Sequence, residues 1–150
     1  MQPRHLCCSH VLLIQHDENQ AFHHWQSTMN SGVQAFVQCR MEEAKNYLNA
    51  ALEIAMLRFA CPANQSFSAL QLIKPSEFLC EIYLCEENVT NASMVLSAVN
   101  ELIHTRDVPC DQCDLSVLES METKIQNKRR MEKPKAMNNY GFASASNSLH

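Results

Sequence analysis

Two cysteines in the C-terminal third of the chain have the spacing that metal sites and redox pairs use. Cys110 and Cys113 form a CxxC motif directly after Pro109. Two thiols at this spacing supply half of a tetrahedral zinc site, or both partners of a redox pair. The motif therefore predicts, as one possible function, a thiol-dependent zinc or redox sensor.

This hypothesis needs more side chains than the motif supplies, because a structural zinc ion takes four ligands. The candidates for the remaining two are His5, Cys7, Cys8, His10 and His104. A thioredoxin-like pair would instead lie beside a βαβ unit, and the surrounding pattern contains none. The alternative is that both cysteines are ordinary loop thiols, and the sequence leaves it open.

A second kind of activity would be covalent catalysis by a nucleophilic side chain with a neighbouring base. His16 and His23 are seven residues apart, so on a helix they lie two turns apart and cannot hold one ion. His24 adds a third imidazole nearby. Cys39 or Cys80 could pair with a histidine as nucleophile and base, but both fall in apolar, core-like patterns. We therefore expect no enzyme activity and assign no cofactor.

Charge divides the chain into an acidic body and a basic end. Residues 1–123 hold 6 basic and 15 acidic side chains, whereas residues 124–150 hold 6 basic and 1 acidic. The basic residues of the end are Lys124, Lys128, Arg129, Arg130, Lys133 and Lys135. A nucleic-acid binder would carry a broad basic face, so we expect no nucleic-acid partner. The basic run is typical of a solvated helix end, or of a docking site for an acidic surface.

Composition limits the remaining classes of protein. The 150 residues are 46% hydrophobic and include only 2 Gly, which disfavours tight hairpins and phosphate-binding loops. No apolar run approaches the ~20 residues that span a bilayer, and no signal-peptide pattern opens the chain. We interpret most of the 8 cysteines as reduced core residues and expect a cytoplasmic protein without a membrane partner.

Apolar residues at helical spacing predict an all-α fold. The pattern indicates helices over residues 21–39 and 42–60, with Asp17 as the N-cap that precedes the first. Residues 1–15 are apolar but irregular, and form either a strand-like or a helical segment that packs on the body. The connections are short, as antiparallel helical hairpins require.

The second half of the chain has a similar pattern. We expect a helical turn at 68–73, a helix over 76–86 that starts near Pro75, and a helix to residue 104 that Asn91 caps. A last helix covers residues 115–130. The sequence thus predicts one domain over residues 1–131, followed by a disordered polar tail over 132–150.

Five positions repeat at a fixed offset of 48 residues. The first set is Gly32, Ala35, Ala44, Leu48 and Ala51, and the second is Cys80, Tyr83, Ala92, Leu96 and Val99. Helices that cross closely need small side chains at the crossing and large ones on either side. The pattern therefore predicts two equivalent helical hairpins.

This arrangement resembles the tetratricopeptide repeat (TPR) family, whose unit is a 34-residue helix–turn–helix. The resemblance covers residues 28–59 and 76–104, and departs from the family in its spacing of 48 residues and in Cys80, where the family has Gly. It implies hairpins stacked as a short superhelix. It also implies a non-enzymatic adaptor, scaffold or chaperone-like module that binds a protein or peptide.

Such proteins bind their partners on the face formed by the first helix of each unit. The positions that the resemblance assigns to this face are Gln26, Met29, Val33, Phe36, Val37, Lys74, Glu77, Glu81 and Leu84. Their character predicts an apolar groove for a helix or an apolar peptide. The alternative is that Met29, Val33 and Phe36 belong to the core. Because the chain is short for a solenoid, self-association is a further possibility.

Overall fold

The structure is a computed structural model that describes residues 6–61, 64 and 66–148. It is all-α, and no strand occurs in those ranges. The six helices are α1 (Cys8–His16), α2 (Glu18–Val37), α3 (Met41–Phe59), α4 (Ala69–Cys85), α5 (Val89–Thr105) and α6 (Gln112–Ser148). The predicted fold class of antiparallel helical hairpins is confirmed.

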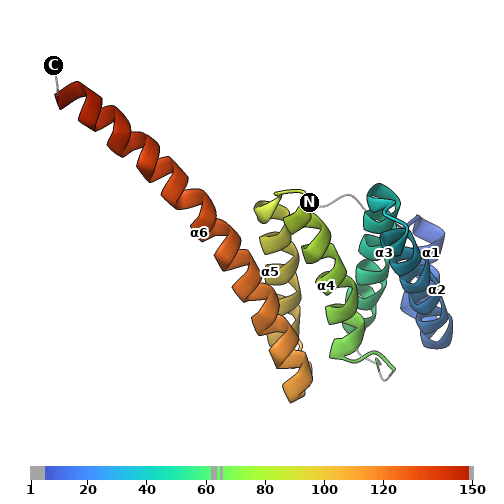
Figure 1. The fold of residues 1–150 in the computed structure, drawn as a ribbon. Helices are drawn as coiled ribbons and strands as arrows, with labels where there is room; N and C mark the ends of the chain where they lie inside the picture. Colours follow the sequence, from blue (N-terminus) through green and yellow to red (C-terminus); the bar gives the residue numbers. More distant parts are fainter. Residues whose placement is uncertain (1–5, 62–63, 65, 149–150) are drawn as a thin grey trace.

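The helices stand side by side in a row that begins at α1 and α2 and ends at α6 (Figure 1). Helices α2 and α3 form one hairpin, and α4 and α5 form the next, which packs against α3. Helix α6 packs against both α4 and α5, while α1 covers α2 and α3 at the other end. Contacts of α4 with both α2 and α6 place these three helices in one layer.

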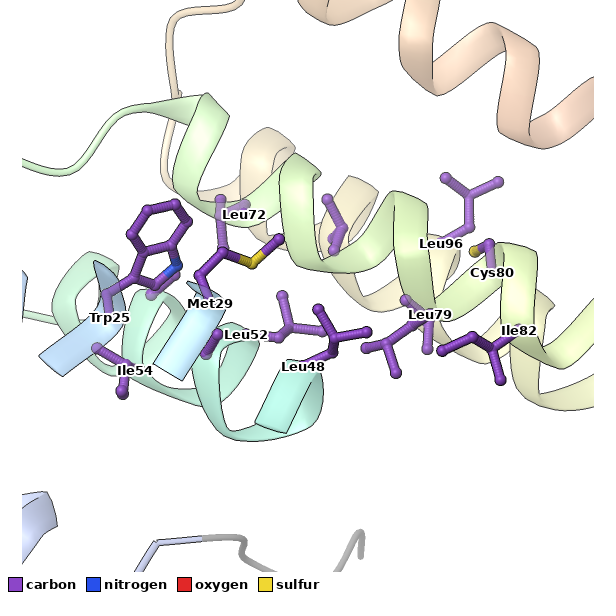
Figure 2. Close-up of a cluster of buried hydrophobic side chains, with 14 of the residues drawn as sticks. Trp25, Met29, Leu48, Leu52, Ile54, Leu72, Leu79, Cys80, Ile82 and Leu96 are labelled. Carbon is purple, nitrogen blue, oxygen red and sulfur yellow. The ribbon is translucent and has the colours of Figure 1, made fainter. Parts of the chain in front are cut away.

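The repeated positions lie where the helices of each hairpin cross. Ala44, Leu48 and Ala92 have no exposed surface, and Leu96 is nearly as buried. Figure 2 shows Leu48 and Leu96 among the buried side chains that connect the hairpins. At the first crossing, a Cβ placed on Gly32 would come within 3.0 Å of the Leu48 side chain. A small residue is therefore required there, as the sequence predicts.

The turns inside the two hairpins have the same geometry at the same offset. Cys39 and Glu87 have left-handed backbones, with φ of 59° and 60°. After each of them, the next amide donates to the carbonyl five residues earlier, at 2.9 Å and 2.7 Å. This is the Schellman arrangement that ends many helices. Asp107, with φ of 51°, ends α5 in the same way.

Two helix starts test the predicted caps. The Asp17 carboxylate accepts a hydrogen bond from the Gln20 amide at 3.1 Å, which confirms Asp17 as the N-cap of α2. The predicted cap of α5 is wrong by one turn. Asn88 caps this helix and accepts from the Asn91 amide at 3.1 Å, so α5 starts at Val89 and not after Asn91.

Helix α4 corrects the prediction of a separate helical turn before Pro75. It runs without interruption through Pro75, although proline cannot donate to the carbonyl four residues earlier, that of Gln71. The Trp25 indole of α2 donates to this carbonyl instead, at 3.1 Å. The Ser76 hydroxyl bonds the next carbonyl, that of Leu72, at 2.7 Å. These bonds compensate for the proline, and sequence periodicity gives no sign of them.

Of the two alternatives for the N-terminal segment, the helical one holds for α1, which is held by a buried arginine of α3. Arg58 is 3% exposed and donates to the carbonyls of Ile14 and Gln15 at 3.0 and 3.1 Å. These carbonyls lie in the last turn of α1, where no helical donor reaches them. Glu18 at the start of α2 lies 3.6 Å from the same guanidinium. Arg58 therefore joins α1 to the first hairpin.

Helix α6 is longer than the sequence predicts. It begins at Gln112 and continues to Ser148, beyond the expected end near residue 130. The sequence predicts a disordered tail over residues 132–150, whereas the backbone of residues 132–148 is helical. Residues 149–150 lie outside the described residues. The segment has no apolar stripe to bury, which is why the sequence pattern ends earlier. Within the described ranges, no helix is long and apolar enough to span a membrane.

Candidate functional site

The nine positions assigned to a partner-binding face differ widely in exposure. Gln26, Val37 and Lys74 are exposed; Val33, Phe36, Glu77, Glu81 and Leu84 are partly buried; and Met29 is buried. All belong to α2 or α4, whose side-by-side packing forms one layer. The two helices do lie next to each other, and Gln26, Val37 and Lys74 are the side chains of this set that are well exposed.

Met29 corrects the prediction of an apolar groove. It is only 6% exposed and lies within the core between Trp25 and the α4 side chain Leu72 (Figure 2). Phe36 meets Phe78 of α4 edge to face, with ring centroids 5.2 Å apart. The alternative assignment to the core thus holds for Met29, which belongs to the same buried cluster as Leu48 of α3 and Leu72 of α4.

Val37 is the apolar position of this set that a partner could reach most easily. At 72% exposure it is the most exposed large apolar residue among the side chains of residues 6–61, 64 and 66–132. It ends α2, next to the left-handed turn at Cys39. An isolated exposed valine is ordinary in soluble proteins, so its significance depends on its neighbours.

The polar members of the face divide into paired and unpaired charges. Glu81 forms an ion pair with Lys124 of α6 at 3.1 Å. Glu77 lies one turn and Lys74 two turns earlier on α4, and neither forms an ion pair with any side chain that the structure describes. The unpaired charges therefore lie on the same helix as the paired one but remain available to a ligand.

Much of the basic end of the chain is occupied by contacts with the body. Besides the Lys124 pair, Lys128 lies 3.6 Å from Glu87, and Arg129 donates to the Ser93 hydroxyl. These contacts attach α6 to the second hairpin. The sequence had suggested a solvated helix end or a docking site, and could not show where the partners of these cations lie.

The CxxC motif lies at the start of α6 and contributes to a helix cap. Asp111 and Asp114 bond each other's amides at 2.7 and 3.0 Å, a reciprocal capping box. Cys110 is partly buried, and burial, followed by the carboxylates of Asp114 and Asp111, raises its thiol pKa. A raised pKa leaves less thiolate for metal binding or redox chemistry.

No cluster of three or more potential metal ligands occurs in the described part of the chain. Cys7, Cys8, His10 and His104 therefore complete no site with the CxxC, and His5 lies outside the described residues. The structure shows no further ligand for zinc at Cys110 and Cys113. Their use as a metal or redox site remains a hypothesis without a supporting contact.

The cysteines differ from their predicted burial. All eight are free, and only Cys80 is buried. Burial raises the pKa of the Cys80 thiol to about 12, which makes it a poor nucleophile. Most of the others project to the surface, because they occupy helix ends and turns rather than crossings.

Cys7 is the thiol whose surroundings favour the charged form. Its Sγ lies 3.1 Å from the Ser9 hydroxyl and 2.9 Å from His10 Nδ1, at the exposed start of α1. Bonds from Ser9, and then from the amide and ring of His10, lower its pKa to about 7. The His10 ring in turn meets His24 of α2, with centroids 5.6 Å apart. The sequence had treated Cys7 only as a possible zinc ligand.

A groove between α5 and α6 was not anticipated. It has a volume of about 430 Å³ and is lined by Thr90, Ser93, Met94, Ser97, Ala98, Glu101 and Arg129. Its α5 residues recur three or four apart, a signal present in the sequence.

No family model matches the chain, and no curated protein or solved structure matches it either.

Proposed function

We propose that this chain is a TPR-like helical scaffold that binds a partner protein or peptide and has no enzyme activity. The observation that supports it is the structural repeat. Two adjacent hairpins have the same left-handed turn, at Cys39 and Glu87, and buried crossings at equivalent positions. Repeated hairpins stack into extended surfaces that serve mainly for binding.

The binding face that we propose is the part of the α2–α4 layer that remains accessible. Val37 offers an exposed apolar contact, while Lys74 and Glu77 offer charges of both signs without partners among the described side chains. Gln26 adds an exposed amide on α2. A helical peptide with an apolar residue flanked by one acidic and one basic side chain would complement these groups.

The cytoplasm is the compartment that best suits this proposal. Five of the eight cysteines are exposed and all are free, and exposed thiols persist most readily in a reducing environment. The CxxC sensor ranks below the scaffold, because burial, and then the carboxylates of Asp114 and Asp111, raise the pKa of Cys110 and disfavour its thiolate.

A displayed library of helical peptides, selected on the purified chain, tests the proposed face. We expect enriched peptides whose affinity falls about tenfold or more, or ~1.4 kcal/mol, in the Val37→Glu and Lys74→Glu variants. Asn46→Glu is the matched control, because Asn46 is exposed on α3, outside this layer. The circular dichroism of each variant verifies that it is folded.

Two results would contradict the proposal. The first is a selection that enriches no peptide. The second is a set of peptides that bind the Val37→Glu, Lys74→Glu and control variants equally well, since binding would then occur elsewhere on the molecule.

A further inference from the structure

The α5–α6 groove differs from the rest of the surface because one helix face contributes most of it. Thr90, Met94, Ser97 and Glu101 are exposed and follow one another along α5 at helical spacing. Met94 is 48% exposed. The small side chains of the groove allow another helix to approach closely, and methionine adapts its shape to an incoming surface. A helix laid along this face would therefore meet small side chains and one adaptable methionine.

Opposite charges mark the two ends of this face. The guanidinium of Arg129 is held at one end by the Ser93 hydroxyl. Glu101 lies eight residues further along α5, which corresponds to about 12 Å. Both line the groove, and neither forms an ion pair with any described residue. Their separation is too large for them to neutralise each other.

We propose that the occupant of this groove is a second copy of the chain, docked so that its α5 runs antiparallel to the first. A two-fold axis near Ser97 would reverse the second helix and bring its Glu101 opposite Arg129 of the first copy. The same axis places Arg129 of the second copy opposite Glu101 of the first copy. Such a face is self-complementary, the condition for a closed symmetric dimer. Met94 of each copy enters the shallow region beside the small side chains of the other.

The charge order of the face favours this occupant. Each copy carries a cation, Arg129, at one end of the face and an anion, Glu101, at the other. An antiparallel two-fold contact therefore forms two ion pairs between the copies. A parallel arrangement of the same faces would oppose like charges at each end, at a cost in free energy. The dimer uses α5 and α6 and leaves Val37 and Lys74 exposed, so it does not depend on the proposed peptide-binding face.

Sedimentation equilibrium of the full chain over a wide concentration range tests the dimer directly. Reducing buffer is essential, because five exposed cysteines could otherwise link copies covalently. We expect a dimer whose association constant falls about tenfold or more in Glu101→Arg and in Arg129→Glu, since each change opposes like charges at both symmetric contacts.

The double variant Glu101→Arg with Arg129→Glu is the decisive measurement. It reverses both charges, so we expect association to return to within about threefold of the original chain. Glu119→Arg is the matched control, because Glu119 is exposed on α6 but outside the groove, and should leave the dimer unchanged.

Three outcomes would overturn the proposal. The original chain could remain monomeric at every concentration, it could form a dimer that the single variants leave intact, or the double variant could fail to restore association. Met94→Asp gives an independent check, since a buried carboxylate at the centre of the contact should abolish the dimer.

Discussion

The two helical hairpins have the same backbone geometry but different chemistry at their crossings. Each turns through a left-handed residue and buries an alanine and a leucine at equivalent positions. In the first hairpin Gly32 lies against Leu48, whereas in the second the Cys80 thiol bonds the Ala92 carbonyl at 3.5 Å. The two hairpins thus share their helix spacing and turn direction. The residue at the crossing differs, glycine in the first hairpin and cysteine in the second, according to the space that the facing helix leaves.

The first and last helices, α1 and α6, are attached to the hairpins by different kinds of interaction. At the first end, the buried Arg58 binds the last carbonyls of α1. At the other end, α6 buries Met121 and Ile125, and its lysines pair with Glu81 and Glu87 at the surface. A hydrogen-bonded buried cation depends strongly on its partners, whereas exposed ion pairs contribute little.

The largest effect is expected from truncating the equivalent leucines. Leu48→Ala and Leu96→Ala should each lower the free energy of unfolding by about 3–4 kcal/mol, because both leave cavities in a closed core. Urea denaturation measures both values, and Leu70→Ala, at a half-exposed position, serves as a control of small effect. A cost below about 1 kcal/mol at either leucine would show that the two crossings are not equivalent.

Only the second hairpin contains an internal proline, and its compensation can be tested. Trp25→Phe should cost about 1–3 kcal/mol, since it removes the donor to the buried Gln71 carbonyl. Pro75→Ala restores a backbone donor, so the same tryptophan substitution should cost less in that background. An equal cost in both backgrounds would mean that the indole does not replace the missing amide.

Gly32 tests how tightly the first crossing is packed. Gly32→Ala should destabilise the chain by about 1 kcal/mol, although alanine is the better helix former, because its Cβ would crowd Leu48. Cys80→Ala provides the contrasting change at the second crossing, where the larger native side chain already fits. Thermal unfolding of both variants gives the comparison, and a more stable Gly32→Ala would refute the close approach.

The left-handed turns should respond alike in both hairpins. Cys39→Gly and Glu87→Gly should each raise the free energy of unfolding by about 0.5 kcal/mol, because glycine relieves the left-handed backbone but gains entropy when unfolded. Chemical denaturation of the two single variants and the double variant checks this. A loss of stability at one turn alone would show that the turns differ in solution.

The smallest expected effect is a difference in reactivity between two thiols, Cys7 at the start of α1 and Cys110 before α6. Cys7 should react with iodoacetamide at pH 7 about threefold faster than an ordinary exposed thiol, since its greater thiolate fraction outweighs its lower nucleophilicity. Its rate should rise with pH through about 7. Cys110, with its raised pKa, should react more slowly than Cys7.

Peptide mass spectrometry follows both reactions in the same sample. Ser9→Ala and His10→Gln should move the midpoint for Cys7 to higher pH, because each removes a bond that stabilises the thiolate. An unchanged midpoint in both variants would mean that these neighbours do not control the thiol.

Local patterns in the sequence predicted α2 and α3 and the repeated positions of the two hairpins. Ala44, Leu48 and Leu96 are buried as the 48-residue offset indicates, because helical periodicity depends on residues three and four positions apart. The Asp17 cap was likewise recognisable from neighbouring residues. Periodicity did not place Asn88 correctly, since the apolar pattern of α5 begins after its cap.

Contacts between distant residues were decided only by the tertiary structure. Trp25 bonds a carbonyl 46 residues away, and Arg58 bonds one 44 residues earlier. Met29 lies in the core because α4 covers it, which its place on an apolar helix face could not reveal. The sequence by itself determined the all-α class and the repeated small and large positions, since helical periodicity is local. The packed structure alone decided which side chains remain exposed, because burial depends on which helices meet.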